Sequence, residues 1–158
     1  MKKITLCLLL FCCAAVEANA QKLPAKITAF VKNHYTNWKA AAPTCDERNW
    51  ILRGDFDGDG KQDYLLRFLS GKSAKKLTEL NLLAFLNYSP NYIPANIDDF
   101  NYDSRARRSS FKVLKKGETI GGTKLENDSV MHYVCETDDA AVFMMKDGKW
   151  RAIEFDAP

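Results

Sequence analysis

A stretch of nine residues, 55–63, constrains this chain more than any other, because its acidic residues all fall on alternate positions. Read as a loop, it has a glycine at position 6, Gly60, and aspartates at positions 1, 3, 5 and 9: Asp55, Asp57, Asp59 and Asp63. A bound calcium ion takes six to eight oxygen ligands, and alternate residues of a tightly curled loop point such oxygens inward. Glycine permits the sharp turn that this geometry needs. The spacing therefore predicts a calcium site in which the backbone carbonyl of Lys61 is a further ligand.

A metal-free turn is the simpler alternative, since Asp-Gly pairs are common in turns. That alternative gives no reason for every carboxylate of the loop to lie in the odd register. Without a cation the crowded carboxylates repel one another, each close pair by about 1 kcal/mol in water. An EF-hand is a second alternative, but it places a bidentate glutamate at position 12 of its loop, which is Leu66 in this chain.

The segments on both sides of the loop alternate in polarity as strands do. Trp50 and Leu52 precede the loop, and Tyr64, Leu66 and Phe68 follow it. Strand, aspartate-rich loop and strand together resemble the FG-GAP/VCBS calcium-binding repeat of the integrin α-propeller type. The resemblance implies that the side chains at loop positions 1, 3, 5 and 9 and the carbonyl at position 7 hold the ion. Propellers repeat such a motif in every blade, whereas this chain has it once, so a different small fold is expected.

Residues 1–20 predict a secretory signal peptide, because a basic start is followed by an apolar run at residues 4–16 and by small residues at the cleavage positions. A membrane span is an alternative, but the run is shorter than the roughly 20 residues that a bilayer core requires. Lipoprotein processing at Cys12 or Cys13 is another. We expect an exported protein, periplasmic or extracellular, whose mature part is a single domain at residues 21–158 without a membrane span.

Two cysteines, Cys45 and Cys135, remain once that leader is removed. In an exported protein two cysteines most simply form one disulfide. The bond would close a loop of about 90 residues and would stabilise the fold by roughly 4–5 kcal/mol on the chain-entropy model. A catalytic thiol is the functional alternative.

Periodicity predicts one helix and about seven strands. The helix is expected at residues 23–39, where apolar residues recur at helical spacing. Besides the two strands that flank the calcium loop, strands are expected at residues 79–88, 111–114, 129–136, 140–145 and 150–155, the last two joined by a tight turn at Asp147 and Gly148. This inventory predicts an α+β fold, in which the N-terminal helix packs on a largely antiparallel sheet.

A charged segment lies between the predicted strands 79–88 and 111–114. Its aspartates, Asp98, Asp99 and Asp103, lack the alternating register of the calcium loop and are expected in a surface loop. Three arginines then follow within four residues, Arg105, Arg107 and Arg108, and could form a recognition surface for an anionic partner. The alternative is a solvated loop in which the arginines balance the preceding acids.

A catalytic arrangement is not evident in the sequence, which has two histidines and neither a Gly-x-Ser-x-Gly nor a His-Glu-x-x-His pattern. A formal net charge of +3 is too near neutral to indicate nucleic-acid binding. We therefore expect a non-enzymatic calcium-binding domain, in which the ion stabilises a hairpin and a recognition surface for a protein or cell-surface partner. The alternative is a small periplasmic hydrolase, or an inhibitor of a secreted enzyme, that uses the loop at residues 98–108.

Overall fold

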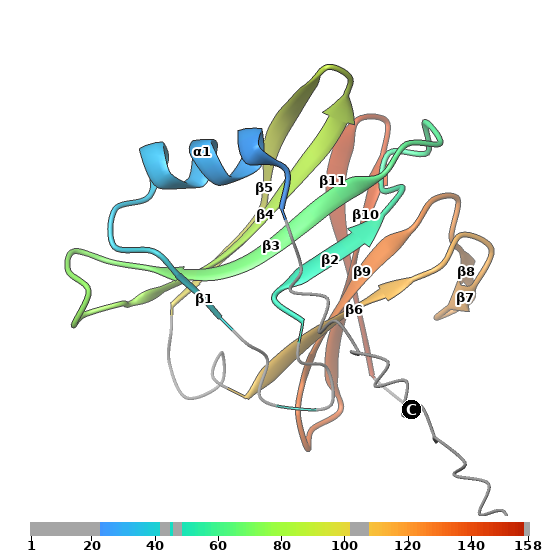
Figure 1. Cartoon of the computed structure of the whole chain (residues 1–158). Helices are drawn as coiled ribbons and strands as arrows, with labels where there is room; N and C mark the ends of the chain where they lie inside the picture. The colour runs from blue at the N-terminus through green and yellow to red at the C-terminus, as the bar shows by residue number, and fades with distance from the viewer. Residues whose placement is uncertain (1–22, 42–44, 46–48, 102–107, 157–158) are drawn as a thin grey trace, which may run out of the picture.

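The computed structural model describes residues 23–41, 45, 49–101 and 108–156, with the backbone alone at 98–101 and 154–156. The described part of the chain is β-rich: 54% of it lies in strands and 9% is helical, with a single short helix. Its strands form two main antiparallel sheets and one two-stranded ribbon (Figure 1). The predicted α+β fold, a helix on one sheet of about seven strands, is therefore wrong. The sequence shows which strands have apolar faces. In the structure these faces are buried mainly between the two sheets rather than under the helix.

The first sheet contains five strands. They are β1 (Lys39–Ala40), β2 (Ile51–Gly54), β3 (Asp63–Ser70), β4 (Glu79–Tyr88) and β5 (Asn91–Asn101). The order is β1-β3-β4-β5, and β2 pairs with β3 as well. β1 lies opposite Phe68 and Leu69, whereas β2 lies opposite residues 63–66. The two short strands thus share one edge of β3, and β5 forms the other edge of the sheet.

The second sheet contains four strands in the order β11-β10-β9-β6. They are β6 (Ser109–Leu114), β9 (Ser129–Val134), β10 (Asp139–Lys146) and β11 (Lys149–Asp156), and the connection between β6 and β9 carries the ribbon of β7 (Thr119–Ile120) and β8 (Thr123–Lys124). The predicted tight turn between β10 and β11 is confirmed. Asp147 and Gly148 have φ angles of 52° and 70°, the left-handed conformation that a type I′ turn needs at both central positions.

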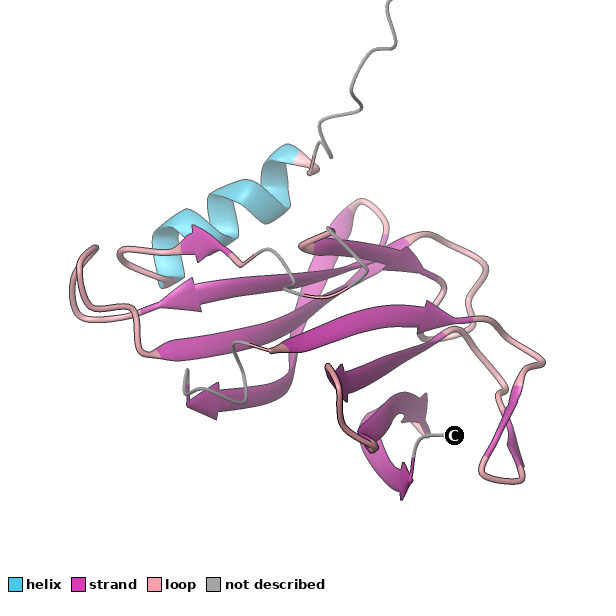
Figure 2. Cartoon of the chain, turned by 90° about the horizontal axis from the view of Figure 1, so that it is seen from below, coloured by secondary structure: helices cyan, strands magenta, loops and turns pink. Residues whose placement is uncertain are grey.

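The main hydrophobic core lies between the two sheets. Leu65 and Leu82 of the first sheet pack in one cluster with Phe111, Val130 and Phe143 of the second. Figure 2 shows the helix on one side of the strands of the first sheet and the second sheet on the other. The two antiparallel sheets therefore pack face to face, and their alternating inward residues fill the space between them.

The helix α1 (Ala25–His34) covers the outer face of the first sheet. Its residues Ile27 and Val31 are buried against Leu66, Phe68 and Leu83. The helix is shorter than the predicted range, which extends to residue 39, because Tyr35 already has extended backbone angles and the chain continues into β1. Because the helix covers one face of β3 and β4 and the second sheet covers the other, these two strands are buried on both sides.

The strand β5 was not predicted from the sequence. Its sequence contains Pro94, and proline lacks the N–H group that a central strand needs. The structure places β5 at an edge, where it pairs with β4 alone and Pro94 lies opposite Phe85. The expectation that Asp98 and Asp99 lie in a surface loop is therefore wrong, since their backbone belongs to this strand. With β1, β7 and β8 also unpredicted, the described chain has eleven strands rather than about seven.

The predicted cysteine pair is confirmed. Cys45 and Cys135 lie at disulfide distance, with their Cα atoms 6.1 Å apart. Cys45 belongs to the segment between β1 and β2, and Cys135 directly follows β9. The bond therefore ties the segment between two strands of the first sheet to the second sheet.

Phe56 is expected to stabilise the fold even though it lies within the predicted calcium loop, because its side chain is fully buried in the main core and faces Trp150 at 6.0 Å between ring centroids. The variant Phe56→Ala should lower the free energy of unfolding by about 3–5 kcal/mol. Urea denaturation in the presence of EDTA measures this effect without any contribution from a metal. The matched control is Ile93→Ala, whose side chain is 50% exposed, and which should cost less than about 1 kcal/mol. Equal losses for the two variants would contradict the placement of Phe56 in the core.

Candidate metal site

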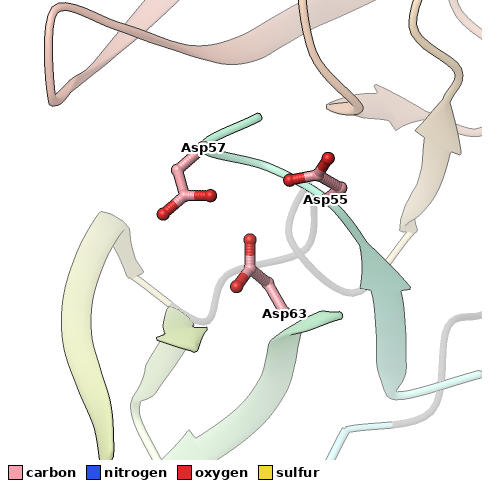
Figure 3. A group of neighbouring side chains, drawn as sticks. All are labelled: Asp55, Asp57 and Asp63. Carbon is pink, nitrogen blue, oxygen red and sulfur yellow. The ribbon is translucent and has the colours of Figure 1, made fainter. Parts of the chain in front are cut away.

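Three of the predicted ligands come together in the structure. The carboxylates of Asp55, Asp57 and Asp63 point toward a common centre (Figure 3), and one oxygen of each lies within 4.8 Å of the others. Two oxygens that share one calcium ion lie at most about 5 Å apart, twice the usual calcium–oxygen distance. This acidic triad could therefore hold a metal ion.

The loop that carries the triad closes the hairpin between β2 and β3. Gly54, the last residue of β2, pairs with Asp63, the first residue of β3, so the two ends of the loop lie side by side. Within the loop Gly58 and Gly60 have φ angles of 80° and 82°. Residues with a side chain rarely adopt such angles, so these two glycines allow the chain to curl around its own carboxylates.

Asp63 is the buried member of the triad, with no exposed surface. Its Oδ2 accepts a hydrogen bond from the N–H of Phe56 at 2.8 Å, and its Oδ1 accepts one from the N–H of Asn87 at 2.8 Å. Burial raises the pKa of Asp63 to about 6, and the two N–H groups only partly oppose this rise. A cation beside the carboxylate would favour its ionised form.

Asp55 and Asp57 are half-buried and organise the backbone of the loop. The two carboxylate oxygens of Asp55 accept hydrogen bonds from the N–H groups of Gly58 at 2.9 Å and Gly60 at 3.0 Å. Asp57 accepts one from the N–H of Asp59 at 3.2 Å. An ionised carboxylate has about four acceptor positions, so these bonds leave lone pairs of both side chains available for an ion.

Asp59 is not a member of the triad. Its carboxylate accepts hydrogen bonds from the backbone N–H of Lys61 at 2.8 Å and from the Lys61 ammonium at 2.5 Å. The ammonium holds the pKa of Asp59 below its usual value. Lys61, predicted as a ligand through its carbonyl oxygen, thus supplies an internal cation to the loop. The ligand roles of Asp59 and of the Lys61 carbonyl stay predictions.

Asp128 is a residue of the site that the sequence did not indicate. It is largely buried and directly precedes β9 in the chain. Its carboxylate accepts three hydrogen bonds, from the N–H of Asp55 at 3.2 Å, the Lys115 ammonium at 2.8 Å and the N–H of Lys116 at 3.1 Å. Burial alone would raise the pKa of Asp128, but these three donors outweigh it and lower the pKa. The local sequence carries no signal for the contact, because Asp55 and Asp128 are 73 residues apart.

The other predicted site residues are placed only in part. Arg105, Arg107 and Asp103 lie outside the described residues. Arg108 is exposed, and its backbone carbonyl accepts the N–H of Cys135 at 2.7 Å. The arginine recognition surface and the alternative site at residues 98–108 stay predictions. The predicted leader also lies outside the described residues, among which no helix has the length and apolarity to cross a bilayer.

Comparison with known proteins gives no relative from which a role could be transferred. The chain matches no protein-family model, no curated protein and no solved structure. The resemblance to the FG-GAP/VCBS repeat therefore depends on the residues of the loop and of its flanking strands.

Asp63 should make unfolding depend on pH when no metal is present. Its pKa of about 6 in the folded protein lies above its ordinary value of 3.8, so the folded state binds the proton more tightly than the unfolded state does. The resulting stabilisation is complete below the ordinary value and is lost as the pH rises through the folded value. Relative to Asp63→Asn, the wild type should lose up to about 1.4 kcal/mol of unfolding free energy per pH unit over this window.

Urea denaturation of both proteins in EDTA, at several pH values between about 4 and about 7, measures this difference. Asparagine cannot ionise, so the comparison removes the titration of this one side chain. Curves that stay parallel over the whole range would show that Asp63 titrates alike in the folded and unfolded states.

Proposed function

We propose that this chain is an exported, non-enzymatic calcium-binding domain, in which the ion stabilises the hairpin between β2 and β3. The observation that carries the proposal is the convergence of Asp55, Asp57 and Asp63 on one centre. The strictly alternating acids of the loop, and their resemblance to the FG-GAP/VCBS repeat, support the same conclusion.

Calcium fits this donor set better than other common metals do. The triad offers carboxylate oxygens alone, which suit hard cations rather than zinc or copper. Magnesium needs a near-ideal octahedron at about 2.0–2.1 Å and usually keeps several of its waters, whereas calcium tolerates an irregular set of protein oxygens. In the loaded protein Asp59 would exchange the Lys61 ammonium for the ion, and the Lys61 carbonyl would complete the ligand set.

The proposed role of the ion is structural. The loop supplies most of the oxygens from its own side chains, so few positions remain for a substrate, and a catalytic metal needs such an open position. A bound cation would neutralise the repulsion among the acids. It would also offset the free-energy cost of burying the charge of Asp63. The hairpin would then present a fixed surface to a protein or cell-surface partner, a role that the resemblance suggests by analogy alone.

Export is part of the proposal. Disulfides persist in secreted and periplasmic proteins and are rare in the cytosol, and Cys45 and Cys135 lie at disulfide distance. Calcium-binding modules outside the cell commonly work with dissociation constants of about 10⁻⁴–10⁻³ M. A loop that keeps an internal lysine counter-ion is compatible with affinity in that weak range.

Thermal unfolding of the purified protein with EDTA or with calcium tests the proposal. At a calcium concentration of about 100 times the dissociation constant, the ion should add roughly 2.7 kcal/mol to the unfolding free energy and raise the midpoint by several degrees. The variant Asp57→Ala should lose this response, because it removes one of the three converging carboxylates. The control Asp138→Ala makes the same change of charge at an exposed position outside the triad, and should respond as the wild type does.

Two results would contradict the proposal. The first is a wild-type midpoint that is the same in EDTA and in calcium up to about 100 mM, which is about 100 times the weakest dissociation constant in the proposed range. That result would make residues 55–63 an acidic turn. The second is an equal response of the wild type and Asp57→Ala, which would place the bound ion elsewhere.

A further inference from the structure

We propose that Asp128 is a positioning residue for the loop at residues 55–63, called the metal loop below. Through this loop Asp128 would couple calcium binding to the second sheet. This inference rests on the proposed function, since it assigns a further residue to the same site. Asp128 is not placed among the ion's ligands. It acts through Asp55, whose backbone it holds at the start of the loop.

The contact between Asp128 and Asp55 involves both backbone groups of Asp55. The Asp55 N–H donates to Oδ2 of Asp128 at 3.2 Å. The Asp55 carbonyl accepts a hydrogen bond from the N–H of Asp128 at 3.1 Å. Two bonds to one residue fix the position and the orientation of its peptide groups, and hence the direction in which the Asp55 side chain leaves the chain.

Asp128 is itself held in place. The Lys115 ammonium donates to Oδ2 at 2.8 Å and the N–H of Lys116 donates to Oδ1 at 3.1 Å. Lys115 and Lys116 directly follow β6, and Asp128 directly precedes β9. The carboxylate is therefore held between the end of β6 and the start of β9, which pair in the second sheet, so a displacement of either end would be transmitted to Asp55.

The loop also approaches Asp128 and Asn127 closely. A Cβ atom added to Gly54 would lie 2.8 Å from the ring of Phe56 and 3.0 Å from Oδ2 of Asp128. A Cβ atom added to Gly58 would lie 2.3 Å from Oδ1 of Asn127. A side chain at Gly54 would require the ring of Phe56 to shift, and one at Gly58 would require the side chain of Asn127 to shift and would also be strained by its φ angle of 80°. The two glycines thus allow the chain to lie close to Asn127 and Asp128, directly before β9.

These contacts predict a reciprocal coupling. If Asp128 holds Asp55 in the geometry that binds the ion, then loss of its carboxylate must weaken calcium binding, because part of the binding free energy is then spent in ordering the loop. Residues that orient metal ligands typically change metal affinity 10–100-fold when they are substituted. By linkage, calcium binding must stabilise the contact between the loop and the second sheet by the same factor.

Titration calorimetry with calcium chloride, on the wild type, Asp128→Asn and Glu126→Gln, tests the inference. Asp128→Asn should raise the calcium dissociation constant about 10–100-fold, because the amide keeps the size of the side chain and loses the charge and one acceptor oxygen. Glu126 is exposed two residues earlier in the chain, so Glu126→Gln makes the same change of charge nearby and should leave the dissociation constant within about twofold of the wild type.

The possible results separate this inference from the proposed function. Calcium binding by the wild type, with an equal dissociation constant for Asp128→Asn, would overturn the positioning role and leave the calcium site intact. A lower melting temperature of Asp128→Asn in EDTA with unchanged calcium affinity would also overturn the positioning role, since a merely structural role produces that pattern. A wild type that does not bind calcium would overturn the proposed function and this inference together.

If Asp128→Asn does not fold, Lys115→Met provides the second variant. It removes one of the donors that hold the Asp128 carboxylate and leaves both hydrogen bonds between Asp128 and Asp55 in place. A severalfold weaker calcium affinity is then expected, smaller than the loss for Asp128→Asn. An affinity equal to that of the wild type would overturn the inference.

Discussion

The burial of β3 and β4 on both faces is the constraint on which the rest of the structure depends. The helix α1 covers one face and the second sheet covers the other, so these two strands have little freedom to move. The candidate metal site is attached to this pair of strands. Asp63 is the first residue of β3. Its Oδ1 accepts a hydrogen bond from the N–H of Asn87, near the end of β4. The triad is thus attached to two strands that are buried on both faces, although Asp55 and Asp57 lie in the loop itself.

The electrostatics of the loop follow from this attachment. Burial disfavours the ionised form of Asp63 and raises its pKa, and the neighbouring charge of Asp57 adds a smaller rise. Backbone N–H groups of Phe56, Gly58 and Gly60 offset part of the negative charge, and the Lys61 ammonium offsets the charge of Asp59. The same donors hold the carboxylates together without a cation. An ion that binds here therefore meets oxygens that are already convergent, and the entropic cost of collecting them is small.

Local patterns in the sequence predicted the features that depend on local geometry. The strand at residues 79–88, the turn at Asp147 and Gly148, and the convergence of Asp55, Asp57 and Asp63 all follow from the spacing of residues close in the chain. The fold class did not follow, because periodicity shows that a strand has an apolar face but not which element covers it. The strand β5 was not predicted for a related reason. Proline is excluded from central strands but tolerated at an edge, so Pro94 argued against a strand. Only the tertiary structure shows that β5 is an edge strand.

Phe56 shows that the loop is part of the packing between the two sheets, besides carrying the acidic triad. Along the loop the carboxylates of the triad converge on one another, whereas the residue between the first two, Phe56, is buried in the core beside Trp150 of the second sheet. Asp128 approaches the same turn from the second sheet and holds the backbone of Asp55. Both contacts join residues that are more than 70 positions apart, so they had no local signature. The acids alone would need only a flexible loop, but the burial of Phe56 fixes the loop against the core between the two sheets. The conformation of this one loop therefore depends both on the charges of the triad and on the packing between the two sheets.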